Sequence, residues 1–285
     1  MSLDTALYDN HLAPAWCPGC GNFAILKAVK RALAELELAP HQVLLCSGIG
    51  QAPKLPHYLH CNMLDGLHGR EVASATGAKL AAPDLTVLVH SGDGGAYGEG
   101  GNHFLAAIRR NIDLTHLIHD NRVYGLTKGQ ASPTTEQGTR AKLQPRGLAM
   151  APLNPLALAI SQGCSFVAQG FAGHGDQLVE LIKAAVRHRG YAVLNILQPC
   201  VSWDQVHTYK YYEERCFELP QGHDPADRNA ALALVLDDPQ RYPLGVIYRN
   251  QRPPYEDAVL AGLEGPLRDR PVEPERVLDL LERFR

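Results

Sequence analysis

The stretch LTVLVHSGDGG, residues 85–95, decides the fold of this 285-residue chain. The mostly apolar run from Leu85 to His90 predicts a buried strand, and the glycine-rich segment after it predicts a tight loop. Two further apolar runs, at residues 43–46 and 114–118, also end in glycine-rich or polar loops. Strands that alternate with helices are typical of a parallel sheet with helices on both faces. The sequence therefore predicts an α/β fold.

Outward from this stretch, apolar periodicity and apolar runs predict the remaining elements. Helices are expected at Asn22–Leu36, Glu71–Ala81, Asn102–Asn111, Pro155–Gly163 and Asp176–Arg189, and later strands at Ser165–Ala168 and Ala192–Leu197. Residues 1–208 are predicted to form this domain, with an irregular N-terminal arm. Prolines interrupt the pattern beyond Tyr209, so residues 209–285 are predicted to be an extended C-terminal segment that packs on itself or on a neighbouring subunit, with one helix at Pro274–Arg283.

The composition is that of an ordinary globular protein, with 45% hydrophobic and 20% charged residues. A net charge of −3 gives no reason to expect a general nucleic-acid role. No apolar run is long enough to span a bilayer. The first ten residues, MSLDTALYDN, do not resemble a secretion signal. We therefore expect a cytoplasmic protein with no membrane partner.

Polar side chains follow two of the predicted strands. Gly92-Asp93-Gly94 comes directly after one strand, and Asn121 ends the next. A lone Gly-Asp-Gly is most often only a turn. In a parallel sheet, however, ligands sit beyond the carboxyl ends of the strands, so the two side chains are expected at one rim. Carboxylate, amide and carbonyl oxygens suit Mg²⁺, which shares its shell with phosphate oxygens. Asp93, Asn121 and a carbonyl near Val123 are therefore predicted to hold Mg²⁺ and a diphosphate.

Several strings in the chain resemble the beta subunits of 2-oxoacid:ferredoxin oxidoreductases, over about residues 14–203. The Gly-Asp-Gly followed by Asn121 is similar to the thiamine diphosphate motif of that family. The other strings are Trp16-Cys17-Pro18-Gly19-Cys20-Gly21, Ser47-Gly48-Ile49-Gly50, Leu67-His68-Gly69-Arg70, Gly101-Asn102-His103, Arg109-Arg110-Asn111 and Asn121-Arg122-Val123-Tyr124-Gly125-Leu126-Thr127-Lys128-Gly129-Gln130.

The resemblance implies a thiamine-diphosphate-binding domain in which Asp93, Asn121 and the Val123 carbonyl bind Mg²⁺. Residues expected to hold the cofactor are Gly48, Ile49, Gly50, His68, Gly92, Asp93, Gly94, Gly95, Asn121, Val123, Tyr124, Gly125 and Leu126. For His68, a core histidine bonded to a backbone carbonyl is the alternative interpretation.

The resemblance also implies an activity and its partners. A 2-oxoacid, with 2-oxoglutarate favoured, reacts with coenzyme A to give an acyl-CoA, CO₂ and reduced ferredoxin, or the reaction runs in reverse. Lys54 and Lys128 are expected to face the carboxylates of the 2-oxoacid, although a solvated lysine is the commoner case. The glutamate that activates the thiamine ring lies on a pyrimidine-binding domain in this family, and the chain shows no second α/β domain. A partner alpha subunit is therefore expected, in a hetero-oligomer.

The family carries a [4Fe–4S] cluster on four cysteines. Cys17, Cys20 and Cys200 match three of them, but Gln51 stands where the family has another cysteine. Either Cys46, at the end of the preceding strand, serves as the fourth ligand, or another ligand completes the cluster, or the cluster is labile or absent; of the remaining cysteines, Cys46 is the favoured candidate. The other cysteines, Cys61, Cys164 and Cys216, are expected to be structural, and an odd total of seven in a chain without an export signal argues against a disulfide framework.

Other functions stay open on the sequence alone. A cluster-free thiamine-dependent decarboxylase or synthase subunit would explain Gln51, and a non-catalytic partner subunit would need no cluster. Cys17 and Cys20 alone also suit a thioredoxin-like dithiol or half of a zinc site, although a structural zinc needs four ligands and no second Cys-x-x-Cys is present.

Overall fold

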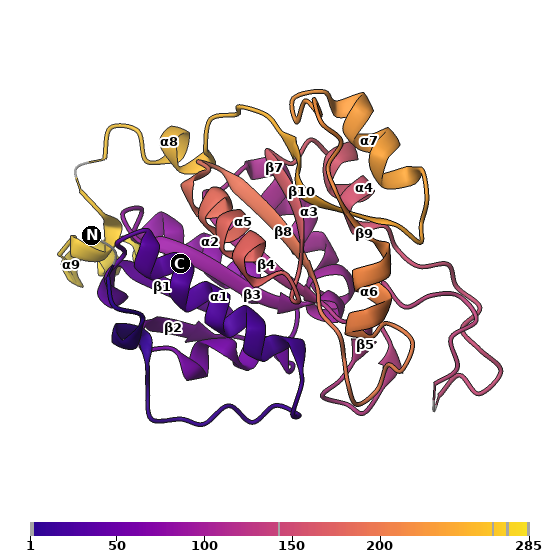
Figure 1. Ribbon diagram of the computed structural model, residues 1–285. Coiled ribbons are helices and arrows are strands. Elements are labelled where there is room, and N and C mark those ends of the chain that lie inside the picture. The colour runs from indigo at the N-terminus through magenta and orange to yellow at the C-terminus, as the bar shows by residue number, and fades with distance from the viewer. Residues whose placement is uncertain (1–2, 142, 264, 272–273, 284–285) are drawn as a thin grey trace.

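The computed structural model describes residues 3–141, 143–263, 265–271 and 274–283. Its centre is an eight-stranded sheet in the order β2-β1-β3-β4-β8-β7-β10-β9 (Figure 1). In that order the strands are Asn62–Asp65, Val43–Ser47, Thr86–Gly92, Leu114–Asp120, Tyr191–Leu197, Phe166–Phe171, Tyr242–Arg249 and Cys216–Glu218. The pairs are parallel except for β10 with β7, which is antiparallel. The predicted α/β class is confirmed.

Helices cover both faces of the sheet (Figure 1). On one face, α1 (Gly21–Glu35) and α5 (Gly175–Arg187) pack in one apolar cluster with inward residues of β1, β3, β4, β7 and β8. The opposite cluster is built with α2 (Glu71–Ala81), α3 (Gly101–Arg110), α4 (Pro155–Ser161) and α7 (Arg228–Leu236). Since side chains alternate along a strand, neighbouring residues of β1 enter different clusters.

The remaining helices and strands are short. They are the helices α6 (Tyr209–Arg215), α8 (Tyr255–Val259) and α9 (Pro274–Glu282), the 3₁₀ turns Thr5–Tyr8, Pro40–Gln42, Ala52–Tyr58 and Leu267–Asp269, the π-helical turn Gly94–Glu99, and the hairpin of β5 (Val123–Tyr124) with β6 (Gln130–Ala131). Among the described helices, none combines the length and the hydropathy that crossing a membrane requires.

The C-terminal segment differs from the extended tail that the prolines predicted. Strand β10 pairs antiparallel with β7, and β9 pairs with β10, so part of residues 209–285 completes the central sheet. Pro243 and Gly245 lie within β10, and a register shift follows at Val246. Proline and glycine weaken a strand pattern, and proline is tolerated at sheet edges and bulges. Because of these two residues, the sequence pattern did not predict β10. The edge strand β2 also escaped prediction because its four residues are all exposed.

Three histidines are buried in the sheet below the strand tips. His90, His116 and His119 are each 0% exposed. A ring nitrogen of His119 lies 2.8 Å from Asn22 Oδ1, and His116 lies 2.8 Å from Ser91 Oγ and 2.6 Å from the Tyr191 hydroxyl. Burial lowers the pKa of His90 and His116 to about 3, and lowers that of His119 well below its ordinary value. All three are therefore neutral at physiological pH.

Candidate active site

The tips of β3 and β4 form the floor of the site. The two strands are parallel neighbours, with Gly92 opposite His119, so Asp93 and Asn121 leave the sheet side by side. Both line one cavity of about 70 Å³, which we call the Asp93 cavity. Its described lining comprises Ile49, Gly50, Gln51, Ala52, Pro53, His68, Gly92, Asp93, Gly94, Gly95, Asn121, Val123, Tyr124, Gly125, Leu126 and Thr127. The structure thus collects every residue expected to hold the cofactor except Gly48.

Asp93 is buried with its carboxylate among hydroxyl groups. Its Oδ2 accepts hydrogen bonds from Ser132 Oγ and from Thr134 Oγ1, the latter at 2.7 Å. Thr134 Oγ1 also lies 2.8 Å from Asp120 Oδ1, and one hydroxyl hydrogen cannot serve two carboxylates. Burial, and next the charge of Asp120, raise the pKa of Asp93 to about 7. A cation at this carboxylate would offset both effects.

Asn121 is held by a local turn. Its Oδ1 accepts a hydrogen bond from the backbone N–H of Val123 at 3.1 Å. The turn passes through Arg122, which has a φ of +59°. Asparagine side chains commonly bond to their own backbone two residues on. This turn holds the amide oxygen at the rim and brings the Val123 backbone to the same cavity.

Glycines let the backbone come close at two points. A Cβ on Gly94 would lie 2.2 Å from the Tyr124 ring, and a Cβ on Gly48 would lie 2.4 Å from Glu71 Oε2. Such approaches are impossible for any other residue without movement of the neighbour. Gly48 does not line the Asp93 cavity, but its missing side chain leaves space for the Glu71 carboxylate.

Glu71 is a residue that sequence analysis missed. It is 1% exposed although it stands in the first turn of α2. Its Oε1 accepts a hydrogen bond from Ser91 Oγ at 2.5 Å, while Oε2 has no partner within the described part of the chain. Burial raises its pKa. A glutamate in a first turn is usually solvated, so only its position after the His-Gly-Arg string hinted at a role.

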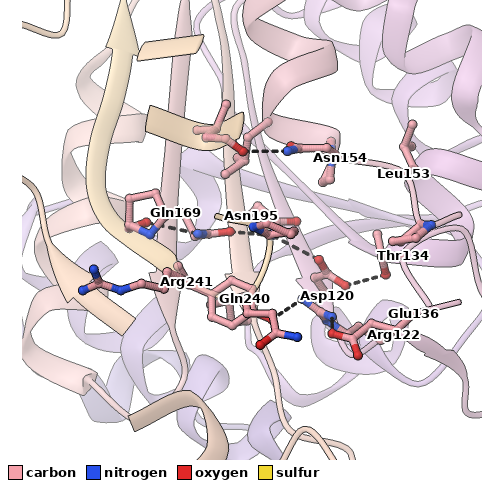
Figure 2. A pocket seen from close by; sticks show the side chains of 18 of the residues that line it. Asp120, Arg122, Thr134, Glu136, Leu153, Asn154, Gln169, Asn195, Gln240 and Arg241 are labelled. Carbon is pink, nitrogen blue, oxygen red and sulfur yellow. Dashed lines mark hydrogen bonds and ion pairs between the residues drawn. The ribbon is translucent and has the colours of Figure 1, made fainter. Parts of the chain in front are cut away.

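A second cavity, of about 420 Å³, is lined by Asp120 and by Thr134, which bonds to Asp93. Figure 2 shows Asp120 on its wall, between Thr134 on one side and Asn195 on the other. Asn195 Nδ2 donates to Asp120 Oδ2 at 3.2 Å, and Gln169 continues the chain of polar contacts. Arg122 bonds to Glu136 at 2.8 Å across the same wall. Thr134 and Asn195 thus hold the carboxylate of Asp120, whose charge acts on Asp93.

The two lysines lie at the margin of the Asp93 cavity. Neither Lys54 nor Lys128 belongs to its described lining, although their chain neighbours Pro53 and Thr127 do. Lys54 is half-buried in the 3₁₀ turn, whereas Lys128 is exposed, has a φ of +77°, and lines a separate cavity of about 320 Å³. Their predicted contact with substrate therefore stays a prediction.

Three of the four proposed cluster cysteines meet. Cys17, Cys20 and Cys200 line a cavity of about 60 Å³, here called the cysteine cavity, together with Gln51, Asn121 and Gly125. The predicted fourth ligand, Cys46, is wrong on geometry: it is 0% exposed and packs with Val72 and Val89 on the other side of the sheet. Among the described residues, no three His, Cys, Asp or Glu side chains are spaced for a single ion. A cubane cluster spreads its thiolates more widely than one ion does.

Comparison with known proteins identifies the family. Residues 42–196 match the family described as "Thiamine pyrophosphate enzyme, C-terminal TPP binding domain", and residues 200–261 match the family formed by the C-terminal region of the pyruvate ferredoxin oxidoreductase beta subunit. The chain is 44% identical over 260 residues to subunit beta of 2-oxoacid:ferredoxin oxidoreductase 1 from Aeropyrum pernix, covering 87% of this chain and 82% of the relative. The chain belongs to the 2-oxoacid:ferredoxin oxidoreductase beta subunits.

Other members of this beta-subunit family extend the match. The 2-oxoglutarate synthase subunit KorB of Methanocaldococcus jannaschii is 39% identical over 81% of this chain and 88% of its own length. A solved 2-oxoglutarate:ferredoxin oxidoreductase from Magnetococcus marinus, with 2-oxoglutarate, coenzyme A and succinyl-CoA bound, aligns with a TM-score of 0.89 and 34% identity, over 98% of this chain and 96% of that one. The resemblance seen in the sequence strings is confirmed.

Proposed function

We propose that the chain binds thiamine diphosphate and Mg²⁺ in the Asp93 cavity and acts as the catalytic beta subunit of a 2-oxoacid:ferredoxin oxidoreductase. The carrying observation is the convergence of Asp93 and Asn121 from neighbouring strand tips on one glycine-walled cavity. Mg²⁺ takes oxygen ligands and usually shares them with substrate phosphates. Asp93, Asn121 and the Val123 carbonyl offer such oxygens, and the burial of the Asp93 carboxylate next to the charge of Asp120 favours a cation.

The proposed reaction converts a 2-oxoacid and coenzyme A to an acyl-CoA, CO₂ and reduced ferredoxin, or runs in reverse. Bound thiamine diphosphate supplies the electron sink for the decarboxylation. The chain's own residues position it: Asp93 and Asn121 anchor the diphosphate end through the ion, and Gly94 lets the backbone approach.

A partner subunit is part of the proposal. A cavity of about 70 Å³ holds an ion and phosphate oxygens, whereas sites for whole cofactors typically enclose about 300 Å³ or more. The rest of the cofactor must therefore extend over the rim toward another chain. We place there an alpha subunit that carries the pyrimidine-binding domain and its activating glutamate, and we expect the isolated beta subunit to be inactive.

For the substrate we favour 2-oxoglutarate. A second carboxylate needs a cation near the thiamine ring. Lys54, in the 3₁₀ turn Ala52–Tyr58, and Lys128, in the β5–β6 hairpin loop, lie at the margin of the Asp93 cavity. Lys128 is exposed and thus free to swing toward a bound dicarboxylate. The solved relative that holds 2-oxoglutarate supports this choice, because the two chains share their fold over nearly their whole length.

For electron transfer we propose a [4Fe–4S] cluster in the cysteine cavity, with ferredoxin as acceptor. Thiolates are the usual cluster ligands, and hydrogen bonds to sulfur tune the potential. Gln198 Nε2 donates to Cys20 Sγ at 3.3 Å, and Ser202 Oγ donates to Cys17 Sγ at 3.0 Å. Gln51 favours the rival function, a cluster-free thiamine-dependent decarboxylase.

The test is anaerobic co-expression of the chain with its partner alpha subunit. The purified complex should bind thiamine diphosphate only with Mg²⁺, and should reduce ferredoxin with 2-oxoglutarate and coenzyme A faster than with pyruvate. Release of CO₂ from the 2-oxoacid without ferredoxin reduction, in protein free of iron, would establish the cluster-free decarboxylase instead. Absence of cofactor binding would overturn the proposal.

A further inference from the structure

Three cysteines from two distant parts of the chain line the cysteine cavity. Cys17 and Cys20 belong to the loop before α1, and Cys200 follows β8. Thiols so arranged repel as thiolates, and a positively charged iron–sulfur core removes that repulsion.

Besides the three cysteines, the cavity is lined by an amide side chain at the position where the family has a cysteine. Gln51 lines both the cysteine cavity and the Asp93 cavity. Its backbone carbonyl is fixed by Trp16 Nε1, which donates to it at 2.8 Å. Its side-chain oxygen Oε1 is buried and accepts no hydrogen bond from the described residues. A buried acceptor without a partner is costly, so its presence beside three cysteines indicates a ligand that it meets.

Cys46 cannot take that place. Its side chain points away from α1 into the apolar cluster of α2 and α3, and burial raises its pKa to about 12. To reach Cys17 it would have to cross the sheet, because adjacent strand residues face opposite sides. The chain therefore offers three thiolates and one neutral amide oxygen.

We propose that Cys17, Cys20 and Cys200 hold a [4Fe–4S] cluster whose fourth iron faces the Gln51 amide and has no thiolate from this chain. The inference rests on the proposed function, which places a cluster in this cavity. That iron is held more weakly than the other three. Loss of one electron to an added oxidant such as ferricyanide turns [4Fe–4S]²⁺ into [4Fe–4S]³⁺, which releases Fe²⁺ and leaves [3Fe–4S]⁺. Ferrous iron and one electron from dithionite restore the original cluster.

The test compares the co-purified alpha–beta complex with its Gln51→Cys variant under anaerobic titration with ferricyanide. The wild-type complex should lose about one iron in four, show the electron paramagnetic resonance signal of a three-iron cluster, and recover with ferrous iron and dithionite. Gln51→Cys supplies the missing thiolate. It should release at least ~10-fold less iron and should shift the cluster potential downward, because one more negative ligand stabilises the oxidised form.

Cys46→Ala is the matched control, since it removes a thiol from outside the cavity. It should keep the iron content and the oxidative conversion of the wild type. Loss of the cluster in Cys46→Ala, or a wild-type cluster that retains all its iron as firmly as Gln51→Cys does, would overturn the inference while leaving the proposed function intact. A complex that binds thiamine diphosphate but contains no iron or sulfide would instead remove the ferredoxin step of the proposed function itself.

Discussion

The Asp93 cavity and the cysteine cavity share a wall but are built in different ways. The Asp93 cavity uses loops that follow neighbouring parallel strands, so its residues meet as soon as β1, β3 and β4 pair. The cysteine cavity combines the arm before α1, the loop after β1 and the end of β8. Its members meet only when α1 docks and β8 joins the sheet. One site follows from local strand order, whereas the other depends on completed packing.

Acid should destabilise the fold that carries both cavities. We expect this to be the largest of the effects predicted below. Among the histidines below the strand tips, burial depresses the folded-state pKa of His90 and His116 from 6.5 to about 3, and that of His119 well below 6.5. Their stabilising effect is fully present above pH 6.5 and is lost as the pH falls toward 3. Over that range the histidines bind protons in the unfolded chain but remain neutral in the folded chain, so acid favours unfolding. For each pH unit of acidification below 6.5, three such groups together lower the free energy of unfolding by up to about 4 kcal/mol.

Denaturant titrations at pH 7.5, 6.5 and 5.5 measure this slope. His116→Gln should reduce the slope of the free energy of unfolding against pH by about one proton, or ~1.4 kcal/mol per pH unit. The control His11→Gln, at an exposed position, should leave the slope unchanged. A stability independent of pH across this range would show that the three rings are already protonated or solvated.

Asp93→Asn should impair cofactor binding in the Asp93 cavity and leave the cysteine cavity unaffected. Removal of the charged ligand should weaken Mg²⁺-dependent binding of thiamine diphosphate by more than ~100-fold, because loss of a mere outer-shell partner already costs about 10- to 100-fold. The cofactor-free variant should be at least as stable as the wild type, since the buried charge near Asp120 is gone. Cofactor titration and thermal unfolding measure the two quantities.

The iron content of Asp93→Asn should stay at the wild-type level, because Asp93 does not line the cysteine cavity. Asp65→Asn is the control at the tip of the edge strand β2, and it should retain cofactor binding. If Asp93→Asn bound the cofactor normally, the two strand tips would not form the metal site.

Gly94→Ala should damage the Asp93 cavity sterically. Its Cβ would lie 2.2 Å from the Tyr124 ring, so the hairpin that carries Val123 must move. Overpacking of this kind costs about 1–3 kcal/mol and should weaken cofactor binding as well. Gly101→Ala, where a Cβ meets nothing within 4 Å, should be neutral or slightly stabilising in its helix. Equal stability and affinity in both variants, by thermal unfolding and cofactor titration, would contradict this packing argument.

Lys128→Ala should have the smallest effect and sharpen the substrate assignment. Loss of a charge-assisted contact to the distal carboxylate costs about 1.5 kcal/mol, which is roughly a ten-fold rise in KM for 2-oxoglutarate. The KM for pyruvate, which lacks that carboxylate, should hardly change. Lys210→Ala removes a similarly exposed lysine on α6 and serves as the control. A parallel change for both substrates would assign Lys128 to structure or to coenzyme A.

Much of the fold and of the Asp93 cavity could be predicted because the signals are local. Apolar runs placed the central strands, and the polar residues after them fell at one rim, since parallel neighbours end on the same edge. The face that Cys46 occupies could not be read in the same way. Alternation says that Leu45 and Cys46 point apart, but which of them faces α1 depends on how the helix docks.

By itself, the sequence determined the parallel α/β core, the family, and the meeting of Asp93 with Asn121, because burial of apolar strands and the direction of their chains leave few other arrangements. Only the tertiary structure decided that Glu71 is buried behind Gly48 and that β10 completes the sheet. These features join segments distant in the chain, and such contacts depend on packing geometry that residue order does not display.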